Sequence, residues 1–102
     1  MATKELQSKK VSKRTINVEP PTEYKIVYLN DDVTTVDFVV FTLTDIFLYS
    51  EQEALDLASK IHHEGNAVIA VYPYEIAEQK GSEVILLARR HNFPLKVNVE
   101  PV

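Results

Sequence analysis

The sequence predicts a small α+β domain with the order β-α-α-β-α-β, in which three helices pack on one face of a small antiparallel three-stranded sheet. Three observations lead to this fold class. Two short runs rich in β-branched and aromatic residues, 24–29 and 67–72, have the composition of strands. The segment 51–64 repeats apolar residues at helical spacing. The segment 75–90 does the same before a final alternating run at 95–99.

The polar segment 1–21 differs from the rest of the chain. It shows neither helical nor strand periodicity over a useful length, and Pro20-Pro21 ends it. We therefore expect a flexible N-terminal extension over 1–21 and a folded core domain over 22–102. A chain of 102 residues has room for one such domain and little for a second.

The first strand is expected over 24–29, because the run ends at the turn-forming residues Asn30-Asp31-Asp32. The next segment, 35–48, is ambiguous. Its β-branched residues favour a strand, whereas its apolar residues recur at helical spacing. A single strand of this length would be unusual, so we predict a helix capped by Thr34 or Thr35.

The second helix has the strongest local signals. Ser50 and Glu53 have the spacing of a capping box, and Gly65 supplies a stop. The sequence therefore predicts a helix over 51–64. Its apolar face consists of residues at i, i+3, i+4 and i+7, which are Ala54, Leu57, Ala58 and Ile61.

The remaining elements follow the same logic. The continuous apolar run 67–72 predicts a buried strand. A third helix is expected over 75–90, with acidic residues early and Arg89-Arg90 last, as the helix dipole favours. Phe93-Pro94 breaks this helix, and the alternation over 95–99 predicts the last strand.

Composition limits the classes of function. There is no cysteine, which excludes disulfides, thiolate metal sites and cysteine nucleophiles. No apolar run is long enough to span a membrane, and Met1–Lys10 lacks the apolar centre of a secretory signal. We therefore expect a cytoplasmic protein without membrane contact. Residues 21–102 carry six basic and thirteen acidic residues, and an acidic body argues against nucleic-acid binding.

Two clusters of polar residues could carry chemistry. The side chains of Asn30-Asp31-Asp32 offer acceptors that can bind a cation, although such residues also form ordinary turns. His62 follows Ile61 on the inner side of its helix, whereas adjacent His63 faces another way, so the two cannot share a zinc ion. His62 could instead satisfy carbonyls at the helix end.

Catalysis is poorly supported. No G-x-S-x-G motif occurs, and two isolated glycines, Gly65 and Gly81, cannot build a phosphate-binding loop. A serine or threonine nucleophile would need a base and an oxyanion site that the sequence does not indicate. We expect no enzyme, no catalytic residue, no cofactor and no metal.

Four segments give a more specific indication: 24–32, 61–65, 71–80 and 88–95. They contain an N-D-D loop, an H-x-x-G helix end and a Y-x-x-E-x-A-E-x-K stretch in fixed order. Together they resemble the ClpS family of bacterial adaptors for the Clp AAA+ protease, over residues 22–100. The resemblance implies a binding protein that recognises bulky apolar N-terminal residues (N-degrons) and delivers their carriers to the unfoldase.

The resemblance also implies roles for particular residues. The groups around the substrate's α-ammonium are Asn30, Asp32 and His62, with Asp31 as acidic support. The pocket for the first side chain is formed by Thr34, Val36, Val39, Ala58, Ile61 and Leu95. Glu75 and Lys80 match the surface that docks on the N-terminal domain of the unfoldase. The family resemblance further implies a monomer.

Three positions depart from the common family pattern. Val36 and Ala58 stand where Met is frequent, and Thr35 stands where Pro is common. Both changes in the pocket remove volume, so we hypothesise tolerance of β-branched N-terminal residues. The alternative is that Phe38 or Phe47 refills the space.

Two other functions remain open from the sequence. One is an interaction module like the C-terminal domain of the ribosomal stalk protein, for which a basic, Gly-rich face would be expected. The other is a small hydrolase that uses Asp31 or Asp32 with His62, but it lacks a recognisable nucleophile.

Overall fold

A computed structural model describes residues 22–102, and the predicted N-terminal extension lies outside this range. The element order confirms the prediction of β-α-α-β-α-β. The elements are β1 (Glu23–Leu29), α1 (Val36–Asp45), α2 (Glu51–Glu64), β2 (Asn66–Pro73), α3 (Tyr74–Arg90) and β3 (Lys96–Pro101).

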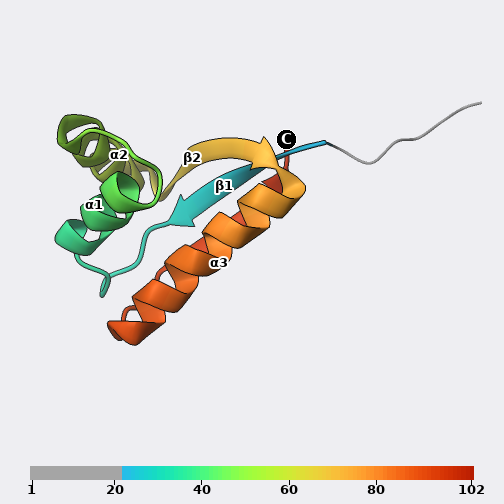
Figure 1. The fold of residues 1–102 in the computed structure, drawn as a ribbon. Coiled ribbons are helices and arrows are strands. Elements are labelled where there is room, and N and C mark those ends of the chain that lie inside the picture. The colour runs from blue at the N-terminus through green and yellow to red at the C-terminus, as the bar shows by residue number, and fades with distance from the viewer. Residues whose placement is uncertain (1–21) are drawn as a thin grey trace, which may run out of the picture.

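The three strands form one antiparallel sheet in the order β2-β1-β3, with β1 in the centre. The helix α3 runs along the sheet and contacts all three strands, as Figure 1 shows. The helices α1 and α2 pack against each other beside one end of the sheet, where α2 also contacts β2. A register shift between Ile26 and Val27 interrupts the β1–β2 ladder.

The predicted helix over 35–48 is shorter in the structure. Thr35 is the N-cap, because its hydroxyl accepts a hydrogen bond from the Phe38 N–H at 3.2 Å. The helix ends at Asp45, and Leu48 then adopts a φ of 62°, which turns the chain toward α2. The sequence offers no glycine at this turn, so the earlier end could not be predicted from it.

The capping signals of α2 act as the sequence indicates. The Glu53 N–H donates to the Ser50 hydroxyl at 3.1 Å, and the Ser50 N–H donates to the Glu53 carboxylate at 3.0 Å. Hydrogen bonds from the backbone and then the hydroxyl of Ser50 lower the pKa of Glu53. Gly65 ends the helix with a φ of 92°, a conformation that favours glycine.

One polar pair lies inside the core between α1 and β1. The Tyr28 and Thr42 side chains are fully buried, and their hydroxyl oxygens are 2.8 Å apart. The Thr42 hydroxyl also donates to the Val39 carbonyl at 2.8 Å. Burial raises the pKa of the Tyr28 phenol, because the charged form is poorly solvated there. The pair therefore fixes α1 against the central strand with every hydroxyl hydrogen-bonded.

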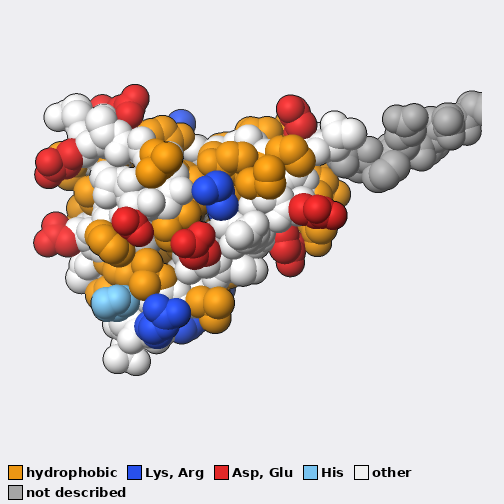
Figure 2. Space-filling model, in the orientation of Figure 1, with side chains coloured by type: hydrophobic (Ala, Val, Ile, Leu, Met, Phe, Trp, Pro, Cys, Tyr) orange, Lys and Arg blue, Asp and Glu red, His pale blue; other side chains and the backbone are white. Residues whose placement is uncertain are grey.

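Apolar and charged side chains are distributed unevenly over the surface. Figure 2 shows hydrophobic side chains gathered over the end of β2 and the beginning of α3, with a basic side chain beside them. Exposed apolar residues in this region include Val71, Tyr74 and Ile76. Among residues 22–102, no helix is long and apolar enough to cross a membrane.

Candidate functional site

A cavity of about 470 Å³ opens between the loop after β1, the first turn of α1 and the second half of α2. Its volume lies in the range of sites that bind small molecules. Eleven residues line it: Asn30, Asp31, Asp32, Val33, Thr34, Thr35, Val36, Val39, Ala58, Ile61 and His62.

A backbone hydrogen bond joins the two polar sides of the cavity. The Asn30 N–H at the end of β1 donates to the Gly65 carbonyl at the end of α2, at 2.9 Å. This bond continues the β1–β2 ladder, in which Leu29 pairs with Asn66. It places the loop of Asn30 across from His62, which lies in the last turn of α2. Segments thirty residues apart in the chain thereby share one rim.

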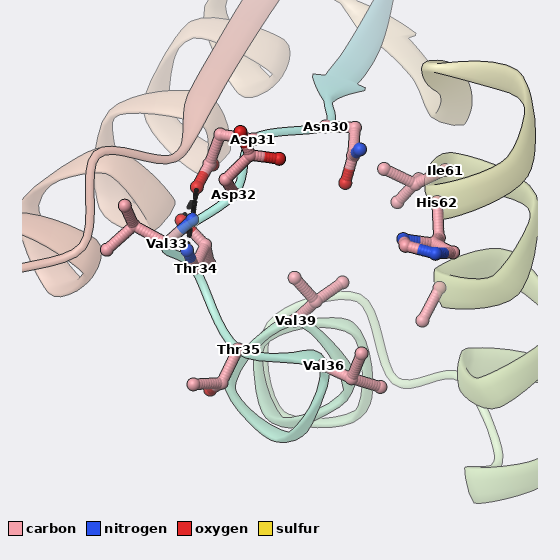
Figure 3. A pocket seen from close by; sticks show the side chains of 11 residues that line it. Asn30, Asp31, Asp32, Val33, Thr34, Thr35, Val36, Val39, Ile61 and His62 are labelled. Carbon is pink, nitrogen blue, oxygen red and sulfur yellow. Dashed lines mark hydrogen bonds between the residues drawn. The ribbon is translucent and has the colours of Figure 1, made fainter.

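Asn30, Asp32 and His62 present polar side-chain atoms to this space. Figure 3 shows their side chains pointing toward the cavity from opposite sides. Among the eleven residues that line the cavity, every side-chain hydrogen bond to another lining residue involves Asp31, which leaves these three groups free of each other. An amide oxygen, a carboxylate and an imidazole nitrogen are therefore available as acceptors on one rim.

Asp31 has a different role from Asp32. Its carboxylate accepts hydrogen bonds from the Val33 N–H at 2.8 Å, the Thr34 N–H at 2.6 Å and the Thr34 hydroxyl at 2.7 Å. Partial burial acts to raise the pKa of Asp31. The hydrogen bonds from Thr34 and Val33, with the positive charge of Arg89, outweigh it and lower the pKa. Asp31 therefore holds the shape of the loop with both of its oxygens.

The floor of the cavity is apolar. Val39, Ala58 and Ile61 are buried, whereas Val36 lies at the mouth with 54% of its surface exposed. The N-cap at Thr35 sets this arrangement, because Val36 and Val39 then lie one turn apart on the same side of α1. Ala58 and Ile61 have the same spacing on α2. A polar rim above an apolar floor can bind a molecule that has a charged end and an apolar end.

Leu95 does not reach this cavity. It is only 1% exposed, belongs to the core cluster and is absent from the lining. This burial explains the difference, because the core takes up its whole side chain. The lining also includes Val33 and Thr35, which neither the sequence pattern nor the family resemblance indicated as pocket residues. Thr35 was recognisable only as a helix cap, and Val33 carried no signal.

The two phenylalanines that could have refilled the pocket are engaged elsewhere. The ring of Phe38 packs against Phe93 with centroids 4.9 Å apart. The ring of Phe47 packs against Tyr28 and Tyr72. Neither phenylalanine lines the cavity, so the space beside Val36 and Ala58 stays open.

His62 and His63 face different directions, as their adjacent positions on the helix predict. His62 lines the cavity, whereas Nδ1 of His63 lies 2.9 Å from the Ser59 carbonyl on the outer side. Within residues 22–102, no group of three or more His, Cys, Asp or Glu side chains is arranged to hold a metal ion.

Glu75 and Lys80 lie on α3, away from the cavity. Glu75 is exposed in the first turn. Lys80 is partly buried, and its Nζ donates to the Ile46 carbonyl at 3.2 Å. The same ammonium lies 5.9 Å from the ring centroid of Phe47 and 5.6 Å from that of Tyr72. Lys80 therefore stabilises the turn after α1 through this hydrogen bond and also places a positive charge beside the two rings.

Comparison with known proteins identifies the group to which this fold and cavity belong. Residues 19–98 match the family model described as "ATP-dependent Clp protease adaptor protein ClpS". This chain belongs to the ClpS family. The ClpS adapter of Nautilia profundicola is 39% identical over 97 residues, which cover 95% of this chain and all of the relative. The ClpS adapter of Treponema denticola is 44% identical over 82 residues, which cover 80% of this chain and 81% of the relative.

A solved ClpS structure supports the fold and shows a ligand. Agrobacterium tumefaciens ClpS2, bound to L-phenylalaninamide, superposes with a TM-score of 0.78. It shares 36% sequence identity and covers 81% of this chain and the whole of that one. Membership of the ClpS family makes this chain a member of a group of Clp protease adaptors. It disfavours the ribosomal-stalk-like and hydrolase alternatives.

Proposed function

We propose that this chain is a non-enzymatic adaptor that binds proteins by a free N-terminal ammonium and a bulky apolar first side chain. It then delivers them to a Clp AAA+ unfoldase. The observation that carries the proposal is the polar rim of Asn30, Asp32 and His62 directly above the apolar floor of one cavity.

The chemistry of a protein N-terminus fits this arrangement. An ammonium offers three donors and no acceptor, and the rim offers an amide oxygen, a carboxylate and an imidazole nitrogen. The charge on Asp32 strengthens the contact. The floor of Val39, Ala58 and Ile61 receives the apolar side chain and removes it from water. L-phenylalaninamide, which ClpS2 binds, has the same two ends: a free ammonium and a benzyl group.

The proposal predicts that binding requires a free N-terminus. A labelled peptide that begins with Phe, Leu, Tyr or Trp should bind the intact chain, measured by fluorescence anisotropy. The N-acetylated peptide should not bind, because acetylation removes the charge and donors. Equal binding of free and acetylated peptides would refute the proposal.

Matched variants test the rim residue by residue. Asp32→Asn and His62→Ala should each weaken binding by about 1–3 kcal/mol, the scale of a charged hydrogen bond left unmet. Asp37→Asn and His63→Ala are the controls, because both side chains are exposed but absent from the cavity lining. Full affinity in both rim variants would exclude the assigned roles.

The same cavity supports a proposal on selectivity. Valine and alanine at positions 36 and 58 leave room that two methionines would occupy, and no phenylalanine fills it. Peptides that begin with Ile or Val should therefore be tolerated, in addition to those that begin with Phe or Leu. Refusal of Ile and Val alongside tight binding of Phe would reject this proposal.

Delivery requires a second surface. We assign it to α3 around Glu75 and Lys80, which match the unfoldase-binding positions implied by the family resemblance. Glu75→Lys should weaken binding to the N-terminal domain of the Clp unfoldase without changing affinity for a Phe peptide. The role is that of a monomeric cytoplasmic adaptor, and sedimentation of the intact chain tests its oligomeric state.

A further inference from the structure

The turn between α1 and α2 carries an unusual leucine. Leu48 has a φ of 62°, in the left-handed region that glycine and asparagine adopt most readily. Its side chain is 82% exposed, the largest value among the apolar residues described as exposed. Leucine at this position contributes little to the stability of the fold, because its backbone is strained and its side chain is exposed to solvent.

The rest of this turn is tightly held. The Tyr49 N–H donates to the Leu43 carbonyl at 3.1 Å, and the Tyr49 hydroxyl donates to the Ile69 carbonyl on β2. On the other side, Lys80 donates to the Ile46 carbonyl at 3.2 Å. Leu48 therefore lies in a turn whose neighbouring residues are held in place by hydrogen bonds.

The brace also connects Leu48 to α3. Lys80 lies one helical turn after Ile76, so both occupy the same side of α3, and Ile76 is exposed. The ammonium of Lys80 covers the rings of Phe47 and Tyr72, next to the turn. The turn that carries Leu48 therefore adjoins Lys80 on α3.

We infer that Leu48 is an apolar anchor that inserts into the Clp unfoldase when the adaptor docks, and that Lys80 is a positioning residue for it. The inference rests on the proposed function, because it extends the surface of Glu75 and Lys80. It commits to the unfoldase as partner, since the family is one of Clp protease adaptors and the turn adjoins that surface. The centres of protein interfaces are apolar and poor in charged residues, whereas charged residues lie at the rim.

The test uses substitutions that suit the backbone of the turn. Leu48→Gly and Leu48→Asn remove the apolar side chain but adopt a positive φ more easily than leucine. The intact adaptor is labelled, and its affinity for the intact Clp unfoldase hexamer is measured by anisotropy. Both variants should lose about fivefold or more in this affinity. Their melting temperatures should be equal to or above that of the unchanged chain.

Two controls separate anchoring from damage. Leu55→Asn removes another exposed leucine, on α2, and should retain affinity for the unfoldase. Leu48→Met keeps an apolar side chain and should restore most of the affinity. The Leu48 variants should bind a Phe peptide within about twofold of the unchanged chain, because Leu48 is absent from the cavity lining.

The outcomes distinguish this inference from the proposed function. If both Leu48 variants keep the affinity of the unchanged chain for the unfoldase, the inference is wrong. If Glu75→Lys still loses affinity for the unfoldase in that case, the proposed docking surface stands. If the Leu48 variants instead change only self-association in sedimentation, the turn contacts a second copy and the inference is wrong. Failure of the unchanged chain to bind free Phe peptides refutes the proposed function independently.

Discussion

Removing the carboxylate of Asp31 should disorder the binding loop without removing a ligand of the ammonium. Asp31→Ala deletes three hydrogen bonds, from the Val33 N–H, the Thr34 N–H and the Thr34 hydroxyl. The loop is partly exposed, so each bond contributes near the low end of its range, about 0.5 kcal/mol. Three such bonds give about 1.5 kcal/mol, or roughly tenfold in Kd when the peptide must reorder the loop.

The comparison of Asp31 with Asp32 makes this prediction specific. In Asp31→Asn the amide oxygen can still accept from the backbone, so affinity for a Phe peptide should fall only about threefold, with each bond weakened but kept. In Asp32→Asn the charge that faces the ammonium is lost, and affinity should fall further. Peptide anisotropy measures both effects, and hydrogen exchange at the Val33 and Thr34 amides reports the order of the loop.

The pH dependence of the loop follows from the direction of the Asp31 shift. The pKa of Asp31 lies below its ordinary value of 3.8. The contribution of this carboxylate is therefore complete above that value, and it is lost as pH falls through the lowered folded-state pKa. Amide protection in the loop should thus persist from about pH 8 to 5. Full protection of both amides in Asp31→Ala would refute this reasoning.

Two further predictions concern other parts of the molecule. Val36→Met and Ala58→Met should weaken Ile and Val peptides by about 1–2 kcal/mol through crowding while sparing Leu peptides, and uniform weakening in the same assay would contradict the selectivity proposal. Thr42→Val should lower the free energy of unfolding in urea by about 1–3 kcal/mol, because it strands the buried Tyr28 hydroxyl; Thr44→Val, which loses only an exposed bond to Phe41, should change it by a few tenths.

The sequence predicted the fold best where local signals were complete. The helix over 51–64 has its predicted bounds, because Ser50, Glu53 and Gly65 fix both ends through contacts within a few residues. The end of α1 was predicted three residues too late. The turn there depends on Leu48 accepting a positive φ, and hydrogen bonds to β2 and Lys80 hold the rest of the turn.

The candidate site was only partly accessible from the sequence. The order of strands and helices, with the family resemblance, was enough to expect the loop of Asn30 and the end of α2 together. The family resemblance set Asp31 apart from Asp32 as acidic support, but the hydrogen bonds of Asp31 could not be predicted, because they depend on which carboxylate the Val33 and Thr34 amides meet. Leu95 is absent from the cavity lining for a similar reason: whether an apolar residue faces a cavity or the core is decided by packing between distant segments.

The helix α1 links the two surfaces that an adaptor needs. Its first turn carries Val36 and Val39 into the cavity, and Ile46, just after its last turn, accepts the hydrogen bond from Lys80. Ten helical residues span about 15 Å, so a bound N-terminus and a docked partner would lie at opposite ends of one short rod. The bond between Thr42 and Tyr28 fixes the middle of that rod to the central strand. The proposed function therefore predicts that a peptide and the unfoldase bind together without displacing each other, which is what delivery requires.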